Sequence, residues 1–304
     1  MAKKEKVVVT GGAGFIGSHI VDALVERGFD VHVIDNLVGG KKERVHKAAT
    51  LHKVDIRNSD SINPIIDGAK YVFHMAALPR VIYSIKHPIE TNEVNIGGTV
   101  NVLRASQEGG VERVVYSASS SAYGDQKTFP LREDMPVNPK SPYGLQKYVG
   151  EQYCKVWSEV TGLPTVSLRY FNVYGPRLDP DGDYALVIGK FLKQKKAGKP
   201  FTITGDGEQT RDFIHVRDVV RANILASEST NVGNGEVINI GAGSDVSINK
   251  VAELIGGPVE YIEPRLEPRH TRADNRLARK LLGWEPLVSL EEGISELKHI
   301  FKLS

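Results

Sequence analysis

The chain has 304 residues, of which 40% are hydrophobic and 25% charged, and its formal net charge at pH 7 is +2. This balance is ordinary for a soluble globular protein, and so small a charge gives no electrostatic reason to expect binding to nucleic acid or to a membrane. A chain of this length can bury a large core and suits one α/β domain with a second, smaller lobe.

The N-terminus and the cysteine content narrow the cellular setting. Residues 1–6 are mostly polar and run directly into a short apolar strand, without a signal-peptide-like stretch or a membrane-spanning segment. We therefore expect a cytoplasmic protein. Cys154 is the only cysteine, so neither an internal disulfide nor a thiolate metal cluster is expected. We interpret it as a small buried apolar side chain on a helix.

Strands and helices are predicted to alternate along the chain as far as Arg169. Short apolar runs predict strands, and apolar residues at helical spacing predict the helices between them. The predicted strands are 7–10, 31–34, 51–54, 71–74, 113–117 and 165–169, and the predicted helices include 17–27, 93–108 and 143–161. This alternation predicts a Rossmann-type α/β fold, a doubly wound parallel sheet with right-handed crossovers and helices on both faces.

Beyond Arg169 the alternation loosens. Glycine and proline gather at 175–176 and 179–182, which predicts loops around a substrate-binding lobe. Segments 217–227 and 236–240 have the character of one more helix and strand that return to the sheet. We therefore predict a Rossmann domain over 1–170, with 212–240 returning to it, and a smaller lobe, interleaved in sequence, made of 171–211 and 241–304.

A glycine-rich loop, TGGAGFIG at 10–17, lies between the first predicted strand and helix. Gly11 would make the turn, Gly14 would let the backbone approach a pyrophosphate, and Gly17 would allow close packing of helix on strand. Asp35 ends the second strand about 20 residues further on, where a carboxylate can hold the ribose diol of adenosine. Because that carboxylate would repel a 2′-phosphate, the pattern favours NAD over NADP.

A tyrosine and a lysine lie one helical turn apart in SPYGLQK at 141–147. Tyrosine titrates near pH ~10 and is a poor base at neutrality. Lys147 follows Tyr143 by four residues on the same helix face, and its charge, together with that of an oxidised nicotinamide, would favour the phenolate. Tyr143 could then take a proton from an alcohol.

A serine-rich loop, SASSSAYG at 117–124, follows the fifth predicted strand. The carboxyl ends of parallel strands open onto the crevice where a dinucleotide lies, so hydroxyls here can reach a bound sugar. A serine-rich loop alone is usually a solvated turn. Its position ahead of Tyr143 and Lys147 favours the functional interpretation.

Together these motifs resemble the extended short-chain dehydrogenase/reductase superfamily, and within it the nucleotide-sugar 4-epimerases. The matching segments occur in order along essentially the whole chain: 10–17, FHMAA at 73–77, the serine loop, SPYGLQK, RYFNVYGP at 169–176 and GDGEQTRDFIHV at 205–216. The resemblance implies NAD as cofactor, a UDP-sugar as substrate, and a homodimer built on helices around 92–108 and 143–161.

The resemblance implies three catalytic residues. Ser119 would hydrogen-bond the sugar 4-oxygen, Tyr143 would act as acid and base, and Lys147 would bind the nicotinamide ribose and lower the tyrosine pKa. The predicted cofactor contacts are Gly11, Gly14, Phe15, Ile16, Gly17, Asp35, Asn36, Asp55, Ile56, Ala76, Ala77, Asn95, Ser117, Tyr143, Lys147 and Val173. For Asp55 and Ile56, a plain strand-end cap is a nearly equal alternative. The predicted substrate contacts are Ser84, Ser119, Ser120, Ser121, Tyr143, Asn172, Tyr184, Val187, Arg211, Arg265, Arg269 and Thr271.

Within this set the resemblance assigns Asn172 to the diphosphate, 184–187 to the sugar-nucleotide backbone and Arg211 to the phosphates, where a guanidinium suits two anionic oxygens. A second phosphate arginine in the family lies in an Arg-x-Gly-Asp segment. This chain instead has EPRLEPRHT at 263–271, which is one residue shorter and lacks that glycine. Either Arg265 or Arg269 could serve, and we favour Arg265.

The expected reaction passes through a 4-keto sugar: Tyr143 removes the proton of the 4-hydroxyl while C4 gives hydride to NAD, and the keto sugar turns over and receives the hydride on its other face. Related dehydratases and decarboxylases carry acidic residues just before the Tyr-Gly pair. Here Ser120 and Ser121 occupy those places, which disfavours dehydration and decarboxylation; a reductase is a further alternative. A noncatalytic NAD-sensing protein would be expected to lose the tyrosine and lysine pair.

Thr271 is predicted to set the choice of sugar. In the epimerases a residue three positions before the aspartate of an Ala-Asp pair limits the space beside the sugar C2, and the pair here is Ala273-Asp274. A threonine leaves room for an acetamido group. We expect UDP-glucose and UDP-galactose, their N-acetylated counterparts UDP-GlcNAc and UDP-GalNAc, or both pairs as substrates. No metal is expected, because His74, His215 and His270 lie apart, and His74 is interpreted as a packed, hydrogen-bonded residue.

Overall fold

The computed structural model describes residues 4–79, 81–179, 187–264 and 269–303. Its main feature is a seven-stranded sheet with the strand order β11-β6-β5-β4-β1-β2-β3, in which every pairing is parallel. The strands are β1 (Lys6–Thr10), β2 (Asp30–Ile34), β3 (Thr50–His52), β4 (Tyr71–His74), β5 (Arg113–Ser119), β6 (Thr165–Tyr170) and β11 (Asn234–Ile240). The predicted Rossmann-type sheet is therefore confirmed, and β11 joins it beside β6.

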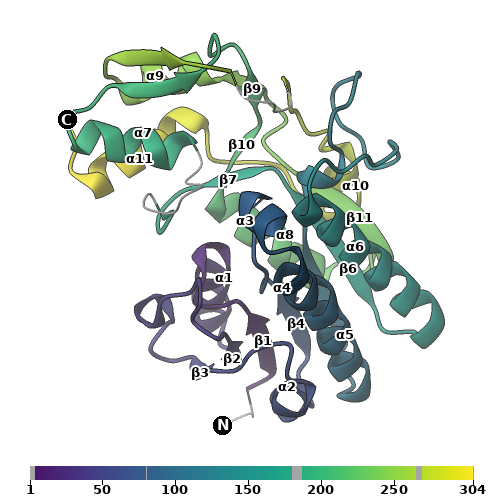
Figure 1. The fold of residues 1–304 in the computed structure, drawn as a ribbon. Helices are drawn as coiled ribbons and strands as arrows, with labels where there is room; N and C mark the ends of the chain where they lie inside the picture. Colours follow the sequence, from purple (N-terminus) through teal and green to yellow (C-terminus); the bar gives the residue numbers. More distant parts are fainter. Residues whose placement is uncertain (1–3, 80, 180–186, 265–268, 304) are drawn as a thin grey trace.

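Helices cover both faces of this sheet (Figure 1). The α-helices of this part are α1 (Phe15–Glu26), α2 (Ser59–Ile66), α3 (Val81–Lys86), α4 (Pro88–Asn92), α5 (Thr99–Glu108), α6 (Pro142–Thr161), α8 (Val216–Glu228) and α10 (Arg276–Leu282). Short 3-10 turns occupy Lys42–Arg44 and Ser120–Ala122, and a π-helix occupies Glu93–Gly98.

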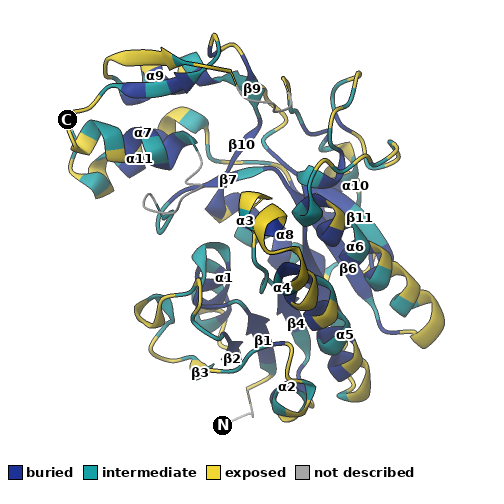
Figure 2. Cartoon of the chain, in the orientation of Figure 1, coloured by how far each residue is buried: buried dark blue, intermediate teal, exposed yellow. Residues whose placement is uncertain are grey.

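Successive residues of each strand point to opposite faces, and both faces are buried, as in other parallel sheets. Val7 and Val9 of β1 pack in one apolar cluster with residues of α1, α8 and α10. Val8 packs in a second cluster with residues of α2, α5 and α6, which includes the buried Cys154. Figure 2 shows the result: buried strands between helices whose outer faces are exposed.

A smaller lobe adjoins the carboxyl ends of the strands and has an apolar cluster of its own around Phe191 and Phe201. Its helices are α7 (Val187–Lys196), α9 (Ile248–Ile255) and α11 (Leu290–Phe301), which lie together in Figure 1. Its strands form three pairs: β7 (Asn172–Tyr174) with β10 (Phe213–His215), β8 (Phe201–Thr204) with β13 (Val259–Ile262), and β9 (Thr210–Arg211) with β12 (Val246–Ser247).

Several predicted elements differ from the structure by one or two residues at their ends, and for two elements the structure shows a physical reason for the difference. The third strand, predicted at 51–54, ends at His52 because the Val54 amide turns back to donate to the His52 carbonyl. The helix predicted at 93–108 begins as the π-helix and becomes α-helical only from Thr99, at the point where Gly98 packs against Ile56. A β-carbon at residue 98 would lie 2.4 Å from Ile56 Cδ1.

Candidate active site

The glycine-rich loop turns sharply between β1 and α1. Gly11 has φ = +70°, the left-handed region that favours glycine, and a β-carbon there would lie 2.7 Å from the Ala76 amide nitrogen. A β-carbon on Gly17 would lie 2.2 Å from the Gly11 carbonyl oxygen, so only glycine lets the helix approach the turn this closely. Gly14, the N-cap of α1, supplies no side-chain cap. The amides of the first helical turn, which include Phe15 and Ile16, thus face a space that suits a dinucleotide phosphate.

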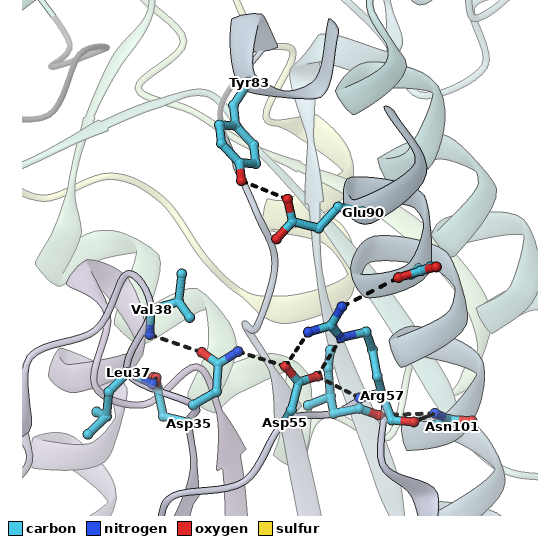
Figure 3. Close-up of polar contacts among 11 residues, drawn as sticks. Asp35, Leu37, Val38, Asp55, Arg57, Tyr83, Glu90 and Asn101 are labelled. Carbon is cyan, nitrogen blue, oxygen red and sulfur yellow. Dashed lines mark hydrogen bonds and ion pairs between the residues drawn. The ribbon is translucent and has the colours of Figure 1, made fainter. Parts of the chain in front are cut away.

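Two aspartates at the carboxyl ends of neighbouring strands shape the predicted adenosine end (Figure 3). Asp35 is buried and accepts hydrogen bonds from the amides of Ala13 (3.0 Å) and Leu37 (2.8 Å). Asp55 accepts 2.8 Å from Asn36 Nδ2 and binds Arg57 through both of its oxygens. The Arg57 guanidinium holds the pKa of Asp55 down to about 2, so this carboxylate is ionised at neutral pH.

The buried polar residues beneath the loop form one hydrogen-bonded chain. His74 is bonded at Nδ1 to Thr10 Oγ1 (2.7 Å) and at Nε2 to Thr99 Oγ1 (2.9 Å). Its burial lowers its pKa to about 3, so the ring is neutral. The Thr10 hydroxyl also accepts from the amide of Ala76, which together with Ala77 follows β4. The interpretation of His74 as a packed, hydrogen-bonded residue is confirmed.

Ser119 and Tyr143 meet where β5 faces the first turn of α6. Ser141 caps that helix, accepting 3.1 Å from the Gly144 amide, and Pro142 occupies its first turn. Burial raises the pKa of Tyr143 above its usual value, and a hydrogen bond with the Ser119 side chain opposes the rise. In the protein alone burial is therefore the main influence on this pKa, and the fall that we expected from Lys147 together with oxidised NAD stays a prediction.

Lys147 lies one turn further along α6 and is buried. Its Nζ donates 2.6 Å to the Ser117 carbonyl and lies 5.0 Å from the centroid of the Tyr116 ring. Burial lowers the pKa of Lys147 to about 8, while the nearby Glu151 raises it. The hydrogen bond from its side chain to the Ser117 carbonyl fixes the lysine beside β5, the strand that leads into the serine loop. In that loop Ser119 Oγ donates 3.1 Å to Ser121 Oγ, and Ser120 begins a 3-10 turn.

Ser84 and Asn95, which the resemblance placed in binding roles, form hydrogen bonds with neighbouring backbone. Ser84 is fully buried, accepting 3.0 Å from the Tyr143 amide and donating 2.6 Å to the Val81 carbonyl. Asn95 Oδ1 accepts 2.8 Å from the Leu78 amide, and Asn95 Nδ2 donates 2.8 Å to Gln146 Oε1. In the structure both residues position the loop after β4 and the start of α6, and a direct contact of either with a ligand stays a prediction.

Three predicted substrate residues come together where the smaller lobe adjoins the sheet. Asn172 begins β7 and donates from its amide (3.0 Å) and from Nδ2 (3.2 Å) to the carbonyl of Asp212. Thr271 Oγ1 accepts 3.3 Å from the Asp212 amide. Arg211, the last residue of β9, directly precedes Asp212. Val187 opens α7, and Val173 is buried in β7.

Tyr184 and Arg265, two of the three remaining predicted substrate residues, lie outside the described residues. Arg269 adjoins this cluster through its backbone, because its carbonyl accepts 2.9 Å from the Thr210 amide, but its side chain pairs elsewhere. Arg269 forms a bidentate ion pair with Asp206, with both N–O distances 2.8 Å and both side chains more than half exposed. That pair lowers the pKa of Asp206 to about 2. Arg269 thus has a carboxylate partner that the sequence did not suggest.

Two side chains of the site were missed by sequence reasoning. Asp212 is fully buried, and its carboxylate accepts from the amides of Ala242 (2.6 Å), Gly243 (3.0 Å) and Ala273 (2.8 Å). Burial raises its pKa to about 7, and the three amides act in the opposite direction. Arg57 follows Asp55 by two residues, and this acid–base spacing was the available sign of their ion pair.

With the geometry described, the comparisons with known proteins define the class. Residues 7–241 match the NAD dependent epimerase/dehydratase family, and the chain belongs to that family. It is a member of the UDP-sugar epimerase group of NAD-dependent nucleotide-sugar enzymes.

Three relatives illustrate this. A putative UDP-glucose 4-epimerase from Methanocaldococcus jannaschii is 39% identical over 97% of this chain and 98% of its own length. The Thermotoga maritima UDP-glucose 4-epimerase structure with UDP-glucose is 40% identical, with a TM-score of 0.92 and 98% of both chains covered. The UDP-N-acetylglucosamine 4-epimerase of Methanobrevibacter ruminantium, solved with UDP-N-acetylmuramic acid, is 38% identical, with a TM-score of 0.92 over 98% of this chain and 99% of that one.

Two kinds of feature are absent from the residues that the structure describes. None of their helices is long and apolar enough to cross a bilayer. Among the same residues, no three His, Cys, Asp or Glu side chains gather in a group that could hold a metal ion.

Proposed function

We propose that the protein is a UDP-sugar 4-epimerase that interconverts UDP-glucose with UDP-galactose, UDP-GlcNAc with UDP-GalNAc, or both pairs. The observation that carries this proposal is the meeting of Ser119, Tyr143 and Lys147 at the carboxyl end of β5, in the same parallel sheet whose strand β1 leads into the glycine-rich loop. A hydroxyl, a phenol and an ammonium placed there can bind and deprotonate a secondary alcohol.

The proposed roles follow from the surroundings of each group. Tyr143 takes the proton of the sugar 4-hydroxyl and later returns it, while Ser119 hydrogen-bonds the same oxygen. Lys147, fixed by the Ser117 carbonyl, supplies a positive charge close to the phenol. When bound, oxidised NAD adds a second positive charge that favours the phenolate, and it takes and returns the hydrogen of C4.

Epimerisation also requires the sugar to turn over while the nucleotide stays in place. We propose that Asn172 and Arg211 hold the diphosphate, with Arg265 or Arg269 as a second arginine. Arg269 is already paired with Asp206, which favours Arg265 as the second arginine that binds the diphosphate. Binding concentrated on the diphosphate would leave the hexose ring loosely held and free to present either face.

The choice between the plain and N-acetylated sugars is proposed to depend on Thr271. Its side chain is small, and its hydroxyl is directed to the Asp212 amide. Relatives named for UDP-glucose and for UDP-N-acetylglucosamine are similarly close in sequence, 40% and 38% identical. We therefore propose that both sugar classes are accepted.

We also propose a homodimer formed through α6 and its neighbours. Leu145, Val156 and Val160 of α6 are exposed to 50%, 47% and 71%, and Ile85 and Ile89 nearby are exposed to 57% and 76%. Exposed aliphatic side chains gathered on neighbouring helices are typical of a surface that a partner covers. Sedimentation analysis of the wild type and of an Ile89→Glu variant tests this, with a dimer expected for the wild type and a monomer for the variant.

Product analysis tests the proposed function. Purified protein is incubated with UDP-glucose and, separately, with UDP-GlcNAc, first without and then with added NAD, and the nucleotide sugars are resolved by chromatography. We expect the C4 epimer of each. A 4-keto-6-deoxy sugar would contradict the proposal in favour of a dehydratase. No product after addition of NAD would contradict it in favour of a noncatalytic protein or of a decarboxylase, which requires a uronic acid as substrate.

A further inference from the structure

Asp212 uses every polar atom it has to join separate segments of the substrate lobe. Its carbonyl accepts twice from Asn172 and its amide donates to Thr271. Its carboxylate accepts from Ala242 and Gly243, in the loop after β11, and from Ala273. Four stretches of chain are therefore fixed relative to one another through one side chain and its backbone.

The carboxylate is also closely surrounded. A β-carbon on Gly241 would lie 2.9 Å from Asp212 Oδ2 and 2.6 Å from Ala273 Cβ. No cation forms an ion pair with Asp212 among the salt bridges of the described residues, so backbone amides are its partners. A buried carboxylate held only by amides is stabilised by their number and geometry, and the loss of one of them is costly.

The segments that Asp212 joins carry the proposed substrate contacts. Arg211, proposed to bind the diphosphate, precedes Asp212 in sequence, and Asn172, with the same proposed role, is hydrogen-bonded to it. Thr271, the proposed sugar gate, accepts a hydrogen bond from the Asp212 amide. Ala273 is held from its other side as well, through a bridge to Leu131 in the segment that follows the serine loop. Asp212 thus lies between the diphosphate contacts and the sugar contacts.

We propose that Asp212 is a positioning residue that sets the spacing between the diphosphate contacts Asn172 and Arg211 and the sugar gate Thr271. The proposal rests on the proposed function for the identity of those contacts. Asp212 itself touches no substrate: it acts through the three residues that it holds. Its loss should weaken the binding of the UDP moiety while leaving the Ser119, Tyr143 and Lys147 group undisturbed.

The test is Asp212→Asn, which keeps the side-chain volume but replaces one oxygen with an N–H donor. Either orientation of the amide points that donor at a backbone N–H, because both carboxylate oxygens accept from amides. We expect the Kd for UDP and the KM for UDP-glucose to rise roughly tenfold or more, with kcat changed by less than about threefold and NAD binding unchanged.

Asp218→Asn is the matched control. Asp218 is also buried, and its carboxylate accepts at 3.0 Å from the amides of Leu287 and Val288, neither of which is a proposed substrate contact. We expect this variant to lose stability but to keep the wild-type Kd for UDP. An equal rise in both variants, or a folded Asp212→Asn protein with a Kd within about twofold of wild type, would overturn the proposal.

A second variant covers the case in which Asp212→Asn does not fold. Gly241→Ala leaves the carboxylate in place but crowds it and Ala273, and it should raise the Kd for UDP in the same direction. An unchanged Kd in a folded Gly241→Ala protein would count against the proposal. Binding of UDP is measured without turnover, so a wild type that binds UDP but yields no epimer refutes the proposed function alone.

Discussion

The NAD-binding region and the substrate lobe assemble their sites in different ways. In the first, the site residues follow adjacent strands of one parallel sheet whose ends are in register: Thr10 lies opposite Ile34 on one side and His74 on the other. In the second, Asn172, Arg211 and Thr271 come from strand pairs and loops that meet at Asp212. In the sheet, many backbone hydrogen bonds share the task of positioning the site residues. In the lobe, the proposed substrate contacts are joined through one buried residue, Asp212.

This difference predicts how each region fails. A change in the NAD-binding region should matter only where a reacting group is removed or a new atom has no space. In the lobe, a change of a single polar atom should be felt at several substrate contacts together. The following predictions sharpen that comparison, from the largest expected effect to the smallest.

Tyr143→Phe should lower kcat by about 100- to 10,000-fold, because it removes the proposed acid and base. UDP should bind as in the wild type, because the phenol is proposed to contact the sugar and not the diphosphate. NAD binding should change far less than kcat, because Tyr143 is one of many predicted cofactor contacts. Tyr148→Phe is the control: Tyr148 lies on the same helix and lines a separate surface cavity of about 470 Å³. Steady-state kinetics distinguish the two, and a Tyr143→Phe enzyme with kcat within about threefold of wild type would refute the assigned role.

Gly17→Ala should weaken NAD binding by roughly tenfold or more, because its new β-carbon would lie 2.2 Å from the Gly11 carbonyl and force the loop to move. Gly97→Ala provides the comparison, since a β-carbon there has no neighbour within 4 Å. Titration of NAD followed by isothermal calorimetry measures both. Equal affinities for NAD in the two variants would show that the glycine-rich loop does not hold the cofactor.

Thr271→Tyr should reduce turnover of UDP-GlcNAc about tenfold or more relative to UDP-glucose, because the larger side chain would occupy the space beside the sugar C2. Thr271→Val, which keeps the size but removes the acceptor for the Asp212 amide, should leave the ratio of the two kcat/KM values near that of the wild type. Unchanged turnover of the N-acetylated sugar in the tyrosine variant would refute the gate.

The smallest effect concerns pH. The pKa of Asp212 is raised by burial from its usual range near 4 to about 7 in the folded protein, so the folded state binds more protons than the unfolded state between these values. Its contribution to stability should therefore fall as the pH rises from about 4 to about 7 and then level off. Urea unfolding of wild type and Asp212→Asn across this range measures the difference; parallel curves would contradict the assignment.

The order and type of the main elements could be predicted because parallel strands buried on both faces have a strong local pattern. The runs at 7–10, 71–74 and 113–117 are short, apolar and bounded by turn residues, and each is found in the sheet. The glycine loop, Asp35 and Tyr143 could be proposed as site residues for a similar reason. The spacing that relates the loop to Asp35 lies within one strand–helix–strand unit, and the spacing of Tyr143 and Lys147 lies within one helix.

The contacts that hold the site could not be predicted. The amides that bind the Asp212 carboxylate come from residues 30, 31 and 61 positions away, and Ser84 meets the Tyr143 amide across 59 positions. No periodicity relates residues that are so distant. The burial that raises the tyrosine pKa could not be predicted for a related reason: the charge of Lys147 can be seen in the sequence, but the burial of the phenol is a property of the fold.

The central claim is that hydrogen leaves and returns to C4 of the same UDP-sugar. We would incubate the protein with UDP-glucose carrying deuterium at C4 in ordinary water and examine the product by NMR. The account predicts UDP-galactose with the deuterium retained at C4 in the inverted configuration. Recovery of unchanged substrate in the presence of NAD, or an epimer that has exchanged its label for solvent hydrogen, would contradict it.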